Sequence, residues 1–406
     1  MAKKTPLIVG LDIGSGSIKA LAAAKKPEAA GWEILGRVEL VSSGIRKGVI
    51  VNIDAVAQSV QEALNRLQEE TGRRIEEVRT NIGGSHIFCT PSHGTVMVSR
   101  ADNKISEEDK RRVIQAATFS LPLNREVIEV FAKEFVVDGH GQIKEPMDMR
   151  GSRLEVEVLN VCAFSPYKNN LINAVLHAGF QISDILPSAL ASAKALLTSQ
   201  QKEIGVCLVD IGSATTDLAI FEEGDLVHTA VFPFGSANIT GDIAVGLKID
   251  VDVAEQIKRE FGTCLSRGGE KKQKIEVPQE SGEEETVVFS QKMLVGFIEP
   301  RVSEMFNLVQ KEIKKVSLKS SLPGGVVLTG GGAKLQKIVE LAKKELKLPV
   351  KIGVPRNWDG LERDPSWSTA CGLITEIEGS EERISKPNMT QGLGTRIKKI
   401  FRTFAT

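Results

Sequence analysis

The tetrapeptide Asp-Ile-Gly-Ser occurs twice in this chain of 406 residues, at 12–15 and at 210–213. Each copy follows a short apolar run and precedes small hydroxyl residues and a second apolar run. This pattern predicts two β-hairpins. A hairpin turn of Gly and Ser presents backbone N–H groups that bind phosphate oxygens, and Gly lets a ligand approach the backbone closely. We therefore expect the two hairpins to hold the phosphates of one nucleotide from opposite sides.

Charged and hydroxyl side chains beside the two turns could complete a phosphate site. Lys19 carries a positive charge that can reach the β- and γ-phosphates. Asp12 and Asp210 end the first strand of each hairpin, where carboxylates can hold Mg²⁺ through water. Asp210 is also the candidate catalytic residue, because a carboxylate there could position water or Mg²⁺. The other residues expected to contact the nucleotide around these turns are Gly14, Ser15, Gly16, Ser17, Gly212, Thr215, Thr216 and, beyond the second hairpin, Gly235.

A third glycine-rich segment, Leu-Thr-Gly-Gly-Gly-Ala at 328–333, follows another apolar run. Consecutive glycines permit the close approach of a flat ring or a sugar phosphate. Because glycine turns before helices are common, this segment on its own is only moderately specific for a nucleotide site. The three loops in this order favour a nucleotide site over three unrelated turns. The nucleotide-contacting residues expected here are Gly330, Gly331, Gly332 and Ala333.

Regular elements must position these loops, and the spacing of apolar residues predicts them. The expected strands are 7–11, 18–24, 32–41, 48–50, 95–99, 129–137, 155–163, 325–328 and 349–354, with a strand, turn and strand at 204–221. The expected helices are 54–72, one starting at Ser106, 165–179, 188–199, 241–247, 251–261, 290–316 with Pro300 kinking or breaking it, and 334–346. Residues 267–285 are expected to form a solvated hairpin or loop, and 376–392 a linker.

Composition excludes several classes of protein. Lys plus Arg and Asp plus Glu are each 52, so the net charge is zero, which argues against a nucleic-acid-binding protein. The histidines have no metal-ligand spacing. No signal segment and no apolar run of the ~18 residues needed to span a membrane is visible, so we expect a cytoplasmic protein. The cysteines lack a CxxC pair, as expected for reduced thiols packed mostly as small hydrophobic side chains: Cys89, Cys162, Cys207, Cys264 and Cys371.

The last residues, 393–406, have the pattern of a helix that lies in an anionic membrane surface. They carry four basic residues and no acid, and their large apolar residues fall on one helical face. The alternative is a basic amphipathic helix that docks on the protein or on a partner. The preceding linker and the exposure of two Phe side chains favour the membrane. The residues expected to contact it are Leu393, Ile397, Ile400, Phe401, Phe404, Arg396, Lys399 and Arg402.

The three loops resemble the phosphate and adenosine motifs of the actin-like ATPase superfamily. Residues 12–15 look like its first phosphate motif, 209–217 like the second and 329–333 like the adenosine motif. Within the superfamily, the chain resembles most the FtsA family of bacterial cell-division proteins. The insertion at about 84–161, the segment 241–258 and the basic tail carry this resemblance. The turn at 81–86 would then be a hinge into the insertion, which we favour over a catalytic role.

The resemblance implies an α/β fold, with two actin-like (ribonuclease H-like) domains around a nucleotide cleft and an inserted α+β subdomain. ATP and Mg²⁺ are the implied cofactors, and Glu255 and Lys258 would flank the adenosine. The implied domains are 1–83 with 162–198 (subdomain 1A), 84–161 (inserted subdomain 1C), 199–242 with 320–375 (2A), 243–319 (2B), the linker 376–392 and the membrane helix 393–406.

The chain departs from many superfamily members at Leu186. If 185–189 is the first connecting segment, a carboxylate that helps to position water is replaced there by an apolar side chain. Because water positioning supplies part of the rate of phosphoryl transfer, we expect ATP to be bound tightly and hydrolysed slowly or not at all.

The resemblance also implies partners: the membrane, other copies of the chain in a filament, the C-terminal peptide of the tubulin-like ring protein FtsZ, and later division proteins at the insertion. The protein would act at the division site, on the cytoplasmic face of the cell membrane. Arg301 could pair with a peptide carboxylate, with Glu304 beside it, although a plain surface charge is the simpler interpretation. Two alternatives stay open: a metabolic kinase of the same superfamily and an actin-like scaffold of pilus assembly.

Overall fold

The computed structural model describes residues 6–26, 31–118, 124–266, 272–278, 284–316 and 322–375. The predicted linker at 376–392 and the predicted membrane helix at 393–406 therefore lie outside the described residues. Within the described ranges, no helix is both long enough and apolar enough to span a membrane.

The first sheet has the strand order β11-β6-β1-β2-β3-β19. Its centre is the hairpin of β1 and β2, and β3 continues it antiparallel. On the other side of β1, β6 and β11 run parallel. The strands are β1 (Ile8–Ile13), β2 (Ser17–Lys25), β3 (Trp32–Val41), β6 (Glu77–Ile82), β11 (Gln181–Pro187) and β19 (Trp358–Asp359), and a separate short hairpin joins β4 (Ile45–Arg46) to β5 (Val49–Ile50).

The second sheet repeats this arrangement. Its part β14-β13-β12-β17-β18 has three antiparallel strands followed by two parallel ones, as β3-β2-β1-β6-β11 does. The chain is therefore an α/β protein with a duplicated sheet, as predicted. These strands are β12 (Val206–Ile211), β13 (Thr216–Glu222), β14 (Asp225–Phe232), β17 (Val326–Thr329) and β18 (Val350–Ile352).

Strands from the region 84–162 extend the second sheet past β14, in the order β7-β10-β8-β9. The ladder between β14 and β7 is short, with Ala230 opposite Phe88, whereas β10 pairs along its length with β7 and β8. These strands are β7 (Phe88–Met97), β8 (Arg125–Val137), β9 (His140–Ile143) and β10 (Arg153–Phe164). The insertion thus contacts the second half of the duplication through β7, although the chain enters it from the first.

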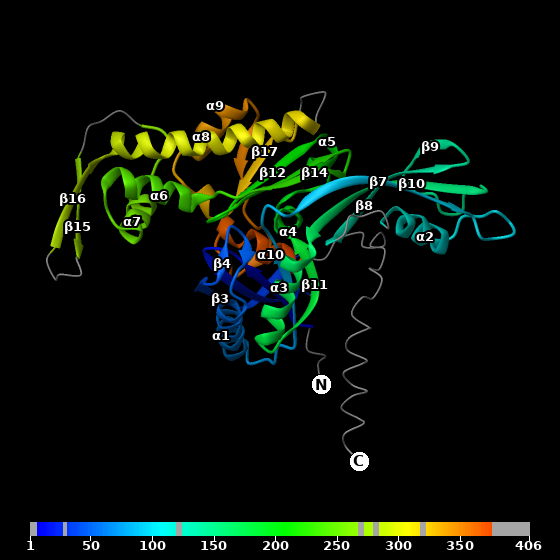
Figure 1. Ribbon diagram of the computed structural model, residues 1–406, viewed down its shortest axis with the longest axis horizontal. Helices are drawn as coiled ribbons and strands as arrows, with labels where there is room; N and C mark the ends of the chain where they lie inside the picture. Colours follow the sequence, from blue (N-terminus) through cyan, green and yellow to red (C-terminus); the bar gives the residue numbers. More distant parts are fainter. Residues whose placement is uncertain are drawn as a thin grey trace, which may run out of the picture. The chain divides into compact units, whose positions relative to one another are not determined.

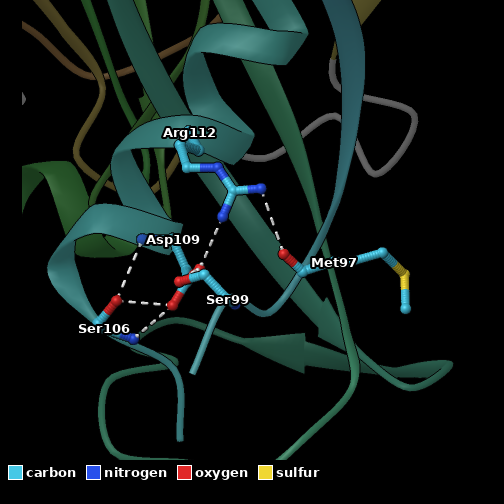
Figure 2. A network of polar contacts seen from close by, with 5 residues as sticks. All are labelled: Met97, Ser99, Ser106, Asp109 and Arg112. Atoms are coloured by element: carbon cyan, nitrogen blue, oxygen red, sulfur yellow. Dashed lines mark hydrogen bonds and ion pairs between the residues drawn. The ribbon is translucent and has the colours of Figure 1, made fainter. Parts of the chain in front are cut away.

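Helix α2 (Glu107–Thr118) packs on β7 and β10 within this region. A buried carboxylate joins it to the end of β7 (Figure 2). Asp109 accepts hydrogen bonds from the backbone and hydroxyl of both Ser99 and Ser106. Arg112 donates to Asp109 at 3.1 Å and to the Met97 carbonyl at 3.3 Å. Ser106 precedes the helix as predicted, and Asp109 holds the start of α2 against the strand.

The other helices cover the two sheets. Helix α8 lies beside α6 and α9 (Figure 1), and it continues through Pro300 rather than breaking there. The helices are α1 (Ile53–Thr71), α3 (Ser165–His177), α4 (Ser188–Leu196), α5 (Ser199–Ile204), α6 (Ser236–Leu247), α7 (Val251–Phe261), α8 (Gln291–Val316), α9 (Ile338–Leu346), α10 (Ser368–Ile374), and the 3₁₀ turns η1 (Gly331–Lys334) and η2 (Pro365–Trp367).

The two largest apolar cores among the described residues follow from this arrangement. One lies around the first sheet, where α1 buries Val60, Leu64 and Leu67. The other lies around the second sheet, where α8 buries Leu294 and Phe306. Both cores sit against the strands that carry the predicted phosphate turns, so the packing of each half holds one turn in place.

Several element boundaries differ from the predictions. The helix predicted at 334–346 begins at Ile338, because the glycine loop first forms the turn η1. The helix predicted at 188–199 ends at Leu196, because Thr198 forms a capping box with Gln201 and starts α5. Strand β7 begins at Phe88, well before the predicted 95–99. The segment predicted as a hairpin or loop at 267–285 contributes to the hairpin of β15 (Lys272–Pro278) and β16 (Glu284–Ser290).

Candidate nucleotide-binding site

The two Asp-Ile-Gly-Ser segments form the same turn. The Gly14 N–H donates to the Ser17 carbonyl at 3.1 Å, and the Gly212 N–H donates to the Thr215 carbonyl at 2.9 Å. The turns therefore present corresponding backbone groups, as the repeated tetrapeptide predicts. Across the two hairpins, Asp12 lies opposite Lys19, and Asp210 lies opposite Asp217.

Asp12 is buried at the end of β1. The Asn81 side-chain amide donates to it at 2.8 Å and to the Ser188 hydroxyl at 3.1 Å. Burial raises the pKa of Asp12 to about 6; Lys19 works in the opposite direction, and the charge of Asp210 adds to the rise. The two predicted carboxylates therefore interact electrostatically, although they come from different halves of the chain.

Asp210 is buried at the end of β12 and is held by hydroxyl groups. Its Oδ2 accepts hydrogen bonds from Ser192 at 2.6 Å and from Thr369 at 3.3 Å. Burial raises its pKa, while these two hydrogen bonds and the charge of Lys19 oppose the rise. The residues come from α4, β12 and α10, so three elements fix this carboxylate.

Asp217 is a third carboxylate of the site, and the sequence analysis did not select it. It is 5% exposed, and its Oδ2 accepts a hydrogen bond from Thr215 at 2.9 Å. In the part of the chain that the structure describes, its buried Oδ1 has no partner. Burial raises the pKa of Asp217 to about 7, and the charges of Asp210 and Asp12 add to the effect. Its position opposite Asp210 across the predicted hairpin is the signal that could have identified it.

Lys19 is the basic group of this cluster. It is 8% exposed, and its ammonium donates to the Ser17 hydroxyl at 2.7 Å and pairs with Glu39 at 3.2 Å. Its positive charge opposes the rise in pKa that burial causes in both Asp12 and Asp210. The predicted phosphate lysine therefore lies among the site's carboxylates.

The two phosphate turns approach each other closely. A Cβ atom on Gly16 would lie 2.7 Å from Cβ of Ser213, so only a glycine fits at this point. The Ser15 hydroxyl accepts a hydrogen bond from the Gly48 N–H at 2.9 Å. Gly16 and Ser15 are thus placed by packing as well as being available to a ligand.

The glycine loop packs directly on the second hairpin. Gly330 has a φ of 84°, and a Cβ there would lie 2.3 Å from Oδ1 of Asp210. A Cβ on Gly331, by contrast, would have no atom within 4 Å. The next two predicted residues, Gly332 and Ala333, are buried in η1. The loop therefore contacts the carboxylate cluster on one side and has free space at Gly331.

Helix α6 begins against the turn of the second hairpin. Gly235 precedes it, and the next two backbone N–H groups, of Ser236 and Ala237, donate to the carbonyls of Gly212 and Ser213 at 2.9 and 2.8 Å. The Thr216 hydroxyl donates to the Phe234 carbonyl at 3.0 Å. The predicted residues Gly212, Thr216 and Gly235 are thereby brought together.

Glu255 and Lys258 form one polar cluster on α7. They pair at 2.5 Å, and Lys258 also donates to the Thr240 hydroxyl at 2.8 Å and the Ser236 carbonyl at 3.2 Å. The last contact places the cluster beside the start of α6, which itself contacts the second turn. Burial and the hydrogen bonds have opposite effects on Glu255, and the bonds from Lys258, Thr240 and Arg259 leave its pKa below the usual value.

The oxygen-rich cluster fits a divalent cation that is held through water. Asp12, Asp210 and Asp217 are buried, repel one another and leave one carboxylate oxygen without a partner among the described residues. Oxygen donors of this kind suit Mg²⁺, which keeps several of its waters. Within the described ranges, no group of three His, Cys, Asp or Glu side chains forms a ligand set that could hold a metal ion directly.

Two further predicted features involve residues outside the phosphate turns, and Leu186 pairs with Asn81 in the ladder between β11 and β6. Leu186 is 2% exposed and packs with Ala191 and Leu373, so an apolar core surrounds it. Arg301, on α8, makes two hydrogen bonds to Asp242 at 2.7 and 3.0 Å and one to Glu304 at 2.6 Å. Its guanidinium is therefore already paired within the protein.

Comparison with known proteins places this arrangement in a family. Residues 207–372 match the family model "Cell division protein FtsA", and 84–162 match the model of the SHS2 domain inserted in FtsA. The chain is 37% identical over 372 residues to the cell division protein FtsA of Pseudomonas aeruginosa, covering 91% of this chain and 88% of the relative.

Solved structures with a similar fold are less similar in sequence. A chain of the PilM–PilN type IV pilus biogenesis complex has a TM-score of 0.63 at 17% identity, covering 90% of this chain and 97% of that one. The MreB5 protein of Spiroplasma citri bound to ADP has a TM-score of 0.56 at 15% identity, covering 98% and 99%. These neighbours confirm the predicted actin-like fold, and the relative and the two family models establish that the chain belongs to the FtsA family of cell-division proteins.

Proposed function

We propose that the chain binds ATP between its two phosphate turns. The observation that carries this proposal is the pair of equivalent hairpin turns, which meet at Gly16 and Ser213 and surround a buried cluster of Asp12, Asp210 and Lys19. Backbone N–H groups of the turns would bind the phosphates, since such groups form an anion-binding surface. The space beside Gly331 would accept the adenosine, next to the cluster of Glu255 and Lys258.

Mg²⁺ would be held through water by Asp12, Asp210 and Asp217. When bound, it would neutralise the phosphate charge and the mutual repulsion of the carboxylates. Asn81, Ser192 and Thr369 would keep Asp12 and Asp210 in place through the hydrogen bonds that they donate. Lys19 would remain available to the phosphates, because its other partners are a hydroxyl and the half-exposed Glu39.

Hydrolysis should be slow. Leu186 and its apolar neighbours Ala191 and Leu373 occupy the segment where a water-positioning carboxylate would be needed. ATP would then act mainly as a ligand that sets conformation and assembly. A steady-state turnover well above about one per second, approaching the median of about 10 per second for enzymes, would refute this part of the proposal.

The nucleotide site can be tested with a fluorescent ATP analogue and Mg²⁺. Asp12→Asn and Asp210→Asn should each weaken binding in the presence of Mg²⁺ at least tenfold and have less effect without the metal. Asp225→Asn is the matched control, because Asp225 lies at the start of β14 and pairs with Lys144 away from the turns. Equal binding by all three variants would exclude the carboxylate cluster as the site.

The proposed cellular role follows from family membership. The chain would form filaments, connect the FtsZ ring to the membrane and recruit later division proteins through the region 84–161. The basic amphipathic segment 393–406 supports the membrane contact, because its four basic residues are each worth about 1 kcal/mol at an anionic surface. Assembly would add avidity to this reversible contact.

Liposome co-sedimentation tests the membrane contact. The full chain should pellet with anionic vesicles and a 1–392 truncation should not, with ATP present or absent. Neutral vesicles provide the control for apolar binding alone. If the full chain and the truncation pellet equally, the tail does not bind the membrane.

Binding of the FtsZ tail peptide tests the role of α8. If Arg301 pairs with a peptide carboxylate, it must leave Asp242, with which it now makes two hydrogen bonds. Arg301→Ala should then abolish binding, whereas Asp242→Asn, which frees the guanidinium, should retain or strengthen it. Loss of binding in both variants would indicate that the ion pair is structural.

The two alternative functions are not favoured. A metabolic kinase needs a pocket for a phosphoryl acceptor, and family membership points instead to cell division. The likeness to the pilus protein is confined to the fold, at 17% identity. Phosphotransfer to a small molecule would revive the first alternative.

A further inference from the structure

A cysteine, a histidine and a glutamate form a linear chain of contacts at the junction of three elements. Sγ of Cys89, on β7, lies 3.3 Å from Nδ1 of His228, on β14. Nε2 of the same imidazole lies 3.0 Å from Oε2 of Glu312, on α8. This arrangement lies outside the phosphate turns, and it is that of a nucleophile, a base and a carboxylate that orients the base.

The carboxylate determines how the imidazole is protonated. Glu312 also pairs with Lys315 at 2.7 Å. Burial works to raise the pKa of Glu312, but its contacts with Lys315 and His228 leave it below the usual value. An ionised carboxylate can only accept a hydrogen bond, so Nε2 of His228 must carry a proton. Nδ1 then either accepts the proton of the Cys89 thiol or donates one to its thiolate.

The surroundings of the sulfur allow both states. Burial works to raise the pKa of the Cys89 thiol, but the hydrogen bond with His228, the backbone contacts and the charge of His228 together outweigh it and leave the pKa below the usual value. The pKa of His228 is correspondingly raised, because its contacts with Cys89 and Glu312 outweigh its burial. The Thr229 carbonyl, 3.6 Å from Sγ, can hold the thiol form. Proton transfer along the line from sulfur to Nδ1 converts one state into the other.

Two groups on neighbouring strands complete the electrostatic surroundings. Arg125, on β8, lies over the ring of Phe88, with its guanidinium carbon 4.5 Å from the ring centre. Cys162, on β10, is fully buried, and burial raises the pKa of its thiol to about 11. The two cysteines on the inserted strands therefore differ: Cys162 is packed as a small hydrophobic residue, whereas Cys89 has a base beside it.

Solvent exposure also distinguishes Cys89 from the other cysteines. Cys89 is half-buried, whereas the other four cysteines, Cys162, Cys207, Cys264 and Cys371, are buried. The side chains of His228 and Glu312 are 21% and 14% exposed. The prediction that the cysteines pack mostly as small hydrophobic side chains is therefore confirmed, and Cys89, which is partly buried against the first core, is the exception in its exposure.

We propose that Cys89 is a modification site, a thiol activated by His228 and Glu312 for reaction with hydroperoxides and other soft electrophiles. In the reaction with a hydroperoxide ROOH, the thiolate attacks the terminal oxygen, an S–O bond forms and the O–O bond breaks. Sulfur loses two electrons and becomes a sulfenic acid, while ROOH is reduced to ROH, which takes its proton from the His228 imidazolium. Thiol and hydroperoxide thus become sulfenic acid and alcohol.

Modification would act on the junction between β7 and β14. That ladder has Ala230 opposite Phe88, and Cys89 directly follows Phe88. An added oxygen or larger group would remove the Sγ contacts to His228 and Thr229, which help to join the inserted strands to the second half of the duplication. The site therefore connects the redox state of one thiol to the attachment of the inserted region.

Alkylation kinetics of the full chain test this proposal. Iodoacetamide should label Cys89 alone in the folded protein, as located by mass spectrometry, and Cys89→Ser should abolish the labelling. The midpoint of the rate against pH should lie below the value of about 8.5 for an ordinary thiol. Hydrogen peroxide followed by a sulfenic-acid probe should modify the same residue.

Two variants separate activation from simple exposure. His228→Gln should raise the pH midpoint of labelling to about 8.5. It should also slow labelling at pH 7 about threefold for each pH unit by which the midpoint rises, because a thiol of higher pKa forms less thiolate but that thiolate is more nucleophilic. Glu312→Gln should shift the pH midpoint in the same direction by a smaller amount. It replaces His228→Gln as the test if circular dichroism shows that His228→Gln is not folded. A wild-type midpoint at or above about 8.5, or the same midpoint in wild type and Glu312→Gln, would overturn the proposal.

Discussion

Asp217 lies directly opposite Asp210 in the ladder between β12 and β13, and both carboxylates are buried. In the equivalent hairpin of the first half, the position opposite Asp12 is occupied by Lys19. The duplicated hairpins thus differ in charge at one position: one carries an acid and a base, and the other carries two acids. Without a cation, this asymmetry places unbalanced negative charge in the site.

The stability of the metal-free protein should therefore depend on Asp217. Its pKa in the folded protein is raised from 3.8 to about 7. Between these values, the folded state keeps a proton that the unfolded chain releases, so the free energy of unfolding falls as pH rises from about 4 to about 7. Asp217→Asn should remove this component and raise the stability at pH 7 by on the order of 3 kcal/mol.

Urea denaturation at pH 5 and pH 8, without nucleotide or metal, measures this effect. Glu222→Gln, at the end of the same strand, is the control and should keep the pH dependence of the wild type. Mg²⁺ with ATP should reduce the difference between wild type and Asp217→Asn. Parallel pH profiles for wild type and Asp217→Asn would show that Asp217 is not the group responsible.

The close approach of the two turns should make Gly16 sensitive to a single methyl group. In Gly16→Ala, the new Cβ would lie 2.7 Å from Cβ of Ser213. The resulting strain should lower the free energy of unfolding by about 1–3 kcal/mol. Ser213→Gly in the same chain should restore most of this loss. Thermal denaturation measures both effects.

Gly241→Ala is the matched control for this pair of variants. Gly241 lies in α6, and a Cβ there would have no atom within 4 Å, so the change should raise the stability by about 0.5–1 kcal/mol. If Ser213→Gly gives no rescue of Gly16→Ala, the contact between the turns is not what requires glycine.

Asn81 connects the chain that enters the insertion to the carboxylate cluster. It donates to Asp12 and Ser188 and accepts a hydrogen bond from the Ile13 N–H at 2.8 Å. Asn81→Ala should lower the free energy of unfolding by about 2–3 kcal/mol, because it leaves a buried carboxylate and a buried N–H without a partner. It should also weaken nucleotide binding through displacement of Asp12.

Chemical denaturation and binding of the ATP analogue check this prediction together. Ser183→Ala, on the adjacent strand β11, removes a hydroxyl that donates to the Val78 carbonyl at 3.2 Å, and it should cost no more than about 1 kcal/mol. Comparable losses in Ser183→Ala and Asn81→Ala would contradict a special role for Asn81.

Asp109 should account for much of the acid sensitivity of the inserted region. Burial works to raise its pKa, but the hydrogen bonds from Ser106 and Ser99 outweigh it and leave the pKa below 3.8. Because the pKa of Asp109 is lower in the folded protein than in the unfolded chain, the ionised carboxylate stabilises the fold at pH values above the unfolded pKa. This stabilisation is lost as the pH falls below about 4. Asp109→Asn should therefore lower the free energy of unfolding by about 2 kcal/mol at pH 7 and by less at pH 3.

Hydrogen exchange of α2 reports this loss locally. Glu107→Gln, an exposed acid in the first turn of the same helix, should change the stability by less than about 0.5 kcal/mol. If Asp109→Asn and Glu107→Gln open α2 equally, the network of Asp109 does not hold the helix.

Local pattern was sufficient to predict most of the elements near the site. The repeated Asp-Ile-Gly-Ser segments predicted both hairpins and their matching turns, because the turn chemistry of Gly and Ser is local. Apolar spacing predicted α1, and its buried face contains Val56, Val60, Leu64 and Leu67. The strands β6, β11 and β14 were not predicted, because their burial depends on neighbours that are distant in the sequence.

The sequence by itself therefore determined the turns, the helical faces and the family, since each depends on residues close together in the chain or on overall similarity. Only the tertiary structure decided which polar groups meet. It buried Asp210 and Asp217 together, gave Asp12 its partner Asn81 and set His228 between Cys89 and Glu312. These residues are separated by up to 223 positions in the chain, and pairing across sheets brings them together. Their altered pKa values arise from that burial and proximity, which no local pattern encodes.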